Sequence, residues 1–101
     1  MKNHEHNLRV PGTPKGLEID PEAGAVYIRY SNEKVKKTTD ISRGEGVFNI
    51  DFDAKNNIVG IEMVGFATIN IHAIERLVLQ HTKSEVNLSR APITMPELCP
   101  A

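Results

Sequence analysis

VFNIDFDAKNNIVGIEMV, residues 47–64, reads as two β-strands joined by a turn, and this hairpin decides the fold. Side chains alternate across a strand, so each strand has one apolar face and one mixed face. A turn at residues 54–57 gives three cross-strand pairs that are apolar on both sides: Phe52/Val59, Ile50/Ile61 and Phe48/Met63. A slip of one residue would bury Asp51 and Asp53, so the hydrophobic pattern excludes that register.

A second hairpin is predicted from residues 17–20 and 25–30, around the turn PEAG. Proline suits the first position of a type I turn, and Gly24 suits the left-handed position that closes it. The predicted pairs are Ile19/Val26 and Leu17/Ile28 inward, with Asp20/Ala25 and Glu18/Tyr27 outward. Residues 34–41 follow as a strand with Val35, Thr39 and Ile41 facing inward. Lys37 shares their face, so we expect this strand at a sheet edge, where lysine discourages pairing with other chains.

A helix is predicted at residues 70–81, because apolar side chains recur there at helical spacing. Asn70 or Thr68 is the expected N-cap. The predicted fold class is therefore α+β, a five-stranded antiparallel β-meander with one C-terminal helix packed on its apolar face.

The expected organisation is a flexible leader at 1–16, a single domain at 17–81 and an extended or disordered tail at 82–101. The tail contains three prolines and no periodic pattern, which is typical of a solvated extension. The alternative is that its segment ITMPEL, residues 93–98, lies across a partner subunit.

Composition narrows the function classes. The chain has 101 residues and a formal net charge of −1, which removes the usual electrostatic argument for a nucleic-acid or acidic-membrane partner. The lone Cys99 cannot form an internal disulfide, and no apolar run is long enough to span a bilayer. The sequence thus predicts a soluble, cytoplasmic protein without a membrane partner.

Acidic residues are the candidates for a polar site. Asp51, Asp53 and Glu62 project from the mixed face of the first hairpin and could hold a hard cation such as Mg²⁺ or Ca²⁺. The alternative is that these residues only form the solvent-exposed face of a sheet whose other face is buried. His4 and His6 form a second, weaker metal candidate. No nucleophile, base and orienting group converge in the sequence, so we predict no catalytic residues and no cofactor.

Charge is unevenly distributed along the chain, and this favours a binding function. Residues 29–43 hold five basic residues against two acidic ones, whereas residues 45–62 hold four acidic residues against one lysine. Opposite charges of this kind suit self-association, so a homodimer is predicted. The candidate partner-binding residues are Tyr27, Arg29, Lys34, Lys36, Lys37 and Leu79.

The segments LEIDPEAGAVYIRYSNEKVKKTTDI and VFNIDFDAKNNIVGIEMVG together resemble a small prokaryotic family catalogued as domain of unknown function 2283, over residues 17–66. The resemblance implies a fold and supplies no activity or site residues. By analogy, small proteins of this kind look like antitoxin-like accessory modules encoded beside toxins.

Three hypotheses follow from the sequence. The favoured one is a non-enzymatic protein-interaction module with a partner such as a toxin. The alternative is a nucleic-acid-binding module that uses the basic segment 29–43, although the net charge disfavours it. The third is a metal-dependent hydrolase built on Asp51, Asp53 and Glu62.

Overall fold

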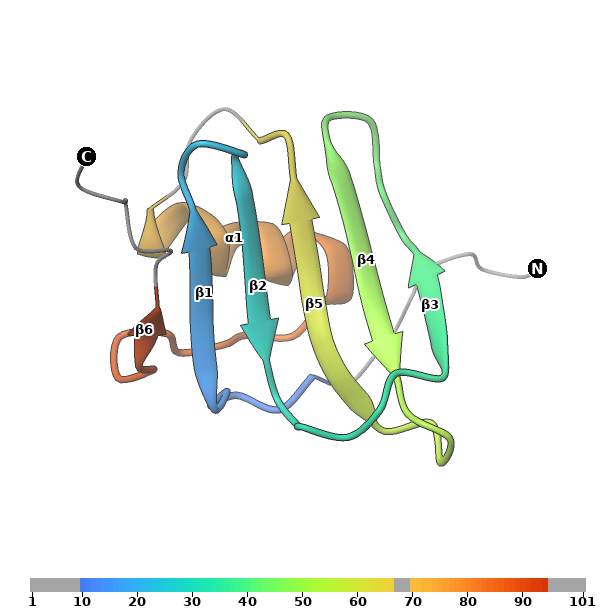
Figure 1. Ribbon diagram of the computed structural model, residues 1–101. Coiled ribbons are helices and arrows are strands. Elements are labelled where there is room, and N and C mark those ends of the chain that lie inside the picture. The colour runs from blue at the N-terminus through green and yellow to red at the C-terminus, as the bar shows by residue number, and fades with distance from the viewer. Residues whose placement is uncertain (1–9, 67–69, 95–101) are drawn as a thin grey trace, which may run out of the picture.

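The computed structural model describes residues 10–66 and 70–94 of the chain, and these residues form one mostly antiparallel sheet with a helix on one side (Figure 1). The elements in chain order are β1 (Gly16–Asp20), β2 (Ala25–Arg29), β3 (Lys37–Asp40), β4 (Val47–Phe52), β5 (Ile58–Val64), α1 (Ile71–Thr82) and β6 (Ile93–Thr94). The strand order across the sheet is β3-β4-β5-β2-β1-β6. The predicted α+β class is confirmed.

The β4–β5 hairpin has the predicted register over most of its length. Phe48 lies opposite Met63 and Ile50 opposite Ile61, but an irregularity after Asp51 brings Phe52 opposite Ile58 instead of Val59. Val59 is nevertheless 1% exposed, and Ile58 is partly buried against the core, so both residues at the irregularity are at least partly shielded from solvent. Its turn is closed by the backbone N–H of Asn56, which donates to Asp53 O, and Asn56 itself has a φ of 66°. Asparagine tolerates this conformation better than most residues.

The β1–β2 hairpin has every predicted pair, from Leu17 opposite Ile28 to Asp20 opposite Ala25. Gly24 has a φ of 63°, the left-handed conformation that the turn was expected to need. The period-2 pattern therefore determined both hairpins.

The simple meander is wrong, because β2 pairs with β5 and not with β3. β5 can occupy the centre of the sheet because Ile61 and Met63 on its inner face are buried in the core. β3 offers no such face: Val35 lies outside the strand and is 42% exposed. β3 is an edge strand, as predicted, and the short parallel strand β6 lies at the opposite edge.

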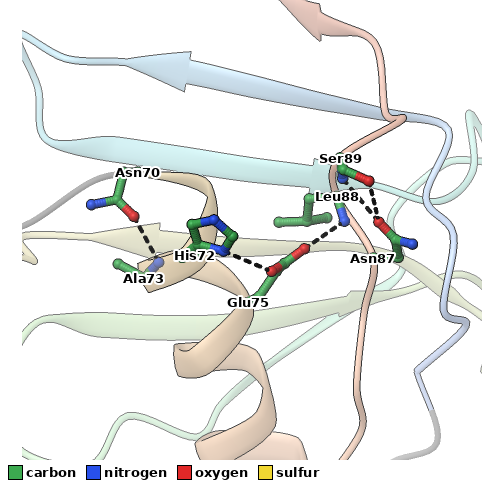
Figure 2. Close-up of polar contacts among 7 residues, drawn as sticks. All are labelled: Asn70, His72, Ala73, Glu75, Asn87, Leu88 and Ser89. Carbon is green, nitrogen blue, oxygen red and sulfur yellow. Dashed lines mark hydrogen bonds and ion pairs between the residues drawn. The ribbon is translucent and has the colours of Figure 1, made fainter.

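Helix α1 covers the inner face of the sheet, with Ile74 and Val78 in the same core as the strands. Asn70 is the N-cap rather than the first helical residue, and its side chain accepts a hydrogen bond from the backbone N–H of Ala73 (Figure 2). Lys83 ends the helix in the left-handed conformation. No helix in the described part of the chain is long and apolar enough to cross a membrane.

The prediction that an extended or disordered tail begins at residue 82 is wrong for residues 82–94. Val86, Leu88 and Ala91 are buried in the core. The backbone N–H of Leu88 donates to Glu75 Oε2 on α1 at 2.9 Å, which ties this segment to the helix (Figure 2).

The end of the predicted leader also packs on the domain, since Val10 is 5% exposed and its N–H donates to Ser84 Oγ. His4 and His6, Thr68, Cys99 and residues 95–98 of the segment ITMPEL lie outside the described residues.

Candidate functional site

The face of the sheet opposite α1 is left uncovered by the described elements (Figure 1). We call it the outer face. The register places its side chains in two neighbouring rows, the first being Asp40, Asn49, Glu62, Tyr27, Glu18 and Thr94, and the second Thr38, Asp51, Gly60, Arg29 and Gly16. All six strands of the described sheet thus contribute polar groups to one surface.

Tyr27 reaches from β2 across β5 to β4. Its hydroxyl donates to Asp51 Oδ2 at 2.8 Å, while Thr38 Oγ1 on β3 donates to Asp51 Oδ1 at 2.6 Å. The tyrosine ring passes over Gly60, where a Cβ atom would lie 2.2 Å from ring atom Cζ. Burial and the bond to Asp51 raise the pKa of Tyr27 well above its usual value. The hydroxyl therefore stays protonated and donates at physiological pH.

Arg29 extends this network to β1. Its Nε donates to Glu18 Oε2 at 2.7 Å, and its Cζ lies 4.9 Å from the centroid of the Tyr27 ring. The bond to Glu18 is the main cause of the raised pKa of Arg29. A connected network of Glu18, Arg29, Tyr27, Asp51 and Thr38 thus crosses the sheet from β1 to β3 and fixes the positions of its members.

The outer face is predominantly acidic. Among the paired strand residues, the outer face carries one guanidinium, that of Arg29, and five carboxylates: Glu18, Asp20, Asp40, Asp51 and Glu62. Beside Tyr27 lies an open depression of about 320 Å³, bordered by Glu18, Asp20, Glu62 and Thr94 over a floor that includes Ala25. This combination of an aromatic edge, an apolar floor and a carboxylate rim suits cationic groups with aliphatic stems.

The predicted metal ligands are not brought together. Asp51 is held by Tyr27 and Thr38, and Glu62 accepts from Asn49 Nδ2 at 3.4 Å. Asp53 instead organises the β4–β5 turn, where its Oδ1 accepts from the backbone N–H groups of Lys55 and Asn57 and its pKa is lowered, mainly by Asn57. Within residues 10–66 and 70–94, no three His, Cys, Asp or Glu side chains are grouped to hold a metal ion. The structure therefore supports neither the metal site nor the hydrolase built on it.

The residues of the basic segment 29–43 are also divided between two strands and the loops beside them. Arg29 lies on β2, whereas Lys37 lies on β3, and β5 and β4 stand between them. Lys34 and Lys36 precede β3 and are exposed, and Lys37 Nζ lies 5.2 Å from the Phe52 ring centroid. The nucleic-acid hypothesis uses these groups together, and the strand order places Arg29 apart from Lys37.

The candidate partner-binding residues lie on two different sides of the molecule. Tyr27 is on the outer face, whereas Leu79 is 41% exposed on α1, which packs on the inner face. Val47 and Val64 lie opposite each other on the outer face. A single partner surface therefore does not include Tyr27 and Leu79 together.

A comparison with family models matches residues 17–66 to a family described as "Protein of unknown function (DUF2283)". This segment belongs to the DUF2283 family. It contains β1 from Leu17 onward, β2 to β5 and every residue of the network on the outer face, while α1 and β6 follow it. Comparisons with curated proteins and with solved structures gave no significant match.

The bridge from Tyr27 over Gly60 to Asp51 was not predicted from the DUF2283 segment. The predicted pair Ile50/Ile61 implies that Asp51 lies opposite Gly60, as it does, but the predicted meander left β2 away from β5, so Tyr27 was not expected to lie near either residue. A signal was present: a glycine inside a buried strand often marks the close approach of another group.

Proposed function

We propose that this chain is a non-enzymatic protein-interaction module that binds a partner with a basic contact surface on its outer face. The single observation that carries the proposal is the excess of carboxylates on the uncovered face, five against the guanidinium of Arg29. Complementary charge steers encounter and orients partners. A toxin with a basic surface is one partner that this chemistry would accept.

The network on the outer face supports binding rather than catalysis. Asp51 and Glu18 are each held by hydrogen bonds from neighbouring side chains, so little side-chain freedom is lost when a partner docks. His72 and His81, the histidines of the described residues, lie on α1 and not among the outer-face carboxylates. The residues gathered on the outer face therefore fit recognition better than proton transfer.

A pair of charge-neutralising variants tests the proposal. The outer-face variant carries Asp20→Asn and Glu62→Gln, two carboxylates that border the depression and lie outside the Tyr27 network. The matched control carries Glu33→Gln and Glu85→Gln, two exposed residues outside the strands of the sheet. Both proteins change in net charge by the same amount, so only position distinguishes them.

The probe is a labelled 12-residue peptide of alternating arginine and serine, with a glutamate and serine peptide of equal length as reference, followed by fluorescence anisotropy at low salt. We expect the outer-face variant to bind the arginine peptide about tenfold more weakly, equivalent to about 1.4 kcal/mol. The control should change by less than about twofold, and added salt should weaken binding. Equal losses in both variants, or equal binding of the two peptides, would contradict the proposal.

A homodimer is a further proposal for this module. Scattered exposed apolar side chains, among them Val35, Val47, Leu79 and Ile93, are consistent with contact between copies. Light scattering between 5 and 500 µM would reveal a mass twice that of the chain, and a constant monomer mass would contradict the dimer.

A further inference from the structure

His81, in the last turn of α1, is enclosed by aromatic rings. Its imidazole stacks on Phe48, with ring centroids 4.1 Å apart and planes inclined by 4°, and meets Phe66 edge-on at 6.3 Å. Only 8% of the residue is exposed. The ring thus joins the helix to the core of the sheet.

The hydrogen bonds of His81 identify its neutral form. Nδ1 lies 2.8 Å from Leu77 O, which can only accept, so Nδ1 carries the proton. Nε2 is then an acceptor, and it is buried without a hydrogen-bond partner in the described part of the chain. Protonation of Nε2 would place an unpaired N–H and a full positive charge in this apolar enclosure.

The charged groups beside His81 oppose that charge. On the loop before β4, Arg43 Nη1 donates to Gln80 O at 2.8 Å, and Arg43 and Lys83 border an open depression together with His81. Glu45 stands on the same loop but does not border this depression. β4 and the segment after β5 contribute the uncharged Phe48 and Phe66. Burial is the main cause of a lowered pKa for His81, and Arg43 lowers it further.

We propose that His81 is a pH-sensitive latch, which holds the last turn of α1 on the sheet while it is neutral and releases that turn when it is protonated. Release separates Gln80 from Arg43 and uncovers the apolar surface around Phe48. The device is distinct from the outer face, because it lies in the layer between α1 and the sheet.

The direction of the pH dependence follows from linkage. The pKa of His81 is lower in the folded chain than the ordinary value of 6.5, so the stabilisation by the neutral ring is complete above pH 6.5. It is lost as the pH falls from 6.5 toward the folded value, by up to about tenfold in the folding equilibrium constant per pH unit.

Urea unfolding of the full chain between pH 5 and 8 tests the latch, with His81→Phe as the variant that keeps an aromatic stack but cannot titrate. We expect the urea midpoint of the parent protein to decrease as the pH is lowered below 6.5. The urea midpoint of His81→Phe should decrease less over the same pH range. His72→Gln is the matched control, since His72 is on the same helix and its side chain is 91% exposed. The urea midpoint of His72→Gln should depend on pH in the same way as that of the parent protein. Parallel profiles for the parent and His81→Phe would overturn the proposal.

NMR titration of the parent protein provides a second test that does not depend on the variant folding. The His81 ring should titrate below 6.5, and amide exchange at residues 78–83, corrected for intrinsic rates, should accelerate at pH 5.5 more than in β4 and β5. A ring that titrates at or above 6.5, or acceleration that is uniform over the domain, would refute the latch.

Discussion

Replacement of Gly60 by alanine should destabilise the protein only while Tyr27 is present. A Cβ atom at residue 60 would meet Cζ and Oη of Tyr27 at 2.2 Å, so the ring must leave its position over β5. When it leaves, its hydrogen bond to Asp51 and its contact with Arg29 are lost. Alanine itself fits the strand, because Gly60 does not have the positive φ that disfavours side chains.

The expected magnitude combines three losses and one gain. The hydrogen bond to Asp51 contributes about 1 kcal/mol at this half-buried position, and the cation–π contact with Arg29 contributes about 0.5–1 kcal/mol. Loss of apolar contact between the ring and β5 adds to this. Alanine in place of glycine in a strand returns about 0.5–1 kcal/mol. We therefore expect Gly60→Ala to lower the free energy of unfolding by about 1–2 kcal/mol.

The same substitution is then made in a Tyr27→Ala background, where no ring obstructs residue 60. There it should be neutral or stabilising by about 0.5 kcal/mol, which gives a coupling energy of about 2 kcal/mol between residues 27 and 60. Urea unfolding of the four proteins measures this cycle, provided that the m-value is constant. An equal effect of Gly60→Ala in both backgrounds would refute the argument, as would a harmless substitution in the parent.

Two further substitutions test the docked tail and the helix cap by urea unfolding. Leu88→Ala should destabilise the protein by about 2–5 kcal/mol, because Leu88 is 0% exposed; a loss below about 0.5 kcal/mol would mean that the segment is not part of the core. Asn70→Ala should lower the free energy of unfolding by about 1 kcal/mol, since the backbone N–H of Ala73 loses its acceptor. Asn70→Asp keeps an acceptor oxygen and should lower it little. Equal losses in the two variants would contradict the role of Asn70 as the cap.

Residues close in sequence could be placed correctly because local chemistry decides their structure. The alternation in residues 47–64 fixed which side chains of β4 and β5 face the core, and only the pairing of Phe52 changed. Gly24 was assigned to a turn, and Asn70 was one of two candidates for the helix cap, because few residues suit those backbone positions. Lys37 indicated an edge strand, since a lysine on an inward face requires access to solvent.

The tail was misassigned because its apolar residues have no regular period. Val86, Leu88 and Ala91 are buried by contacts with strands and helix that lie far from them in sequence, and no local pattern reports such contacts. The polar residues that suggested a solvated tail lie between these three buried side chains.

The sequence by itself determined the two hairpins, their inner and outer faces and the helix, because each depends on periodicity and turn chemistry within about twenty residues. Only the tertiary structure decided that β2 pairs with β5, since either neighbour of β2 would satisfy the same alternation. That pairing brings Tyr27 over Gly60 to Asp51 and removes Arg29 from the lysines of β3. The candidate site therefore depends on strand order, which is a property of the whole core rather than of any segment.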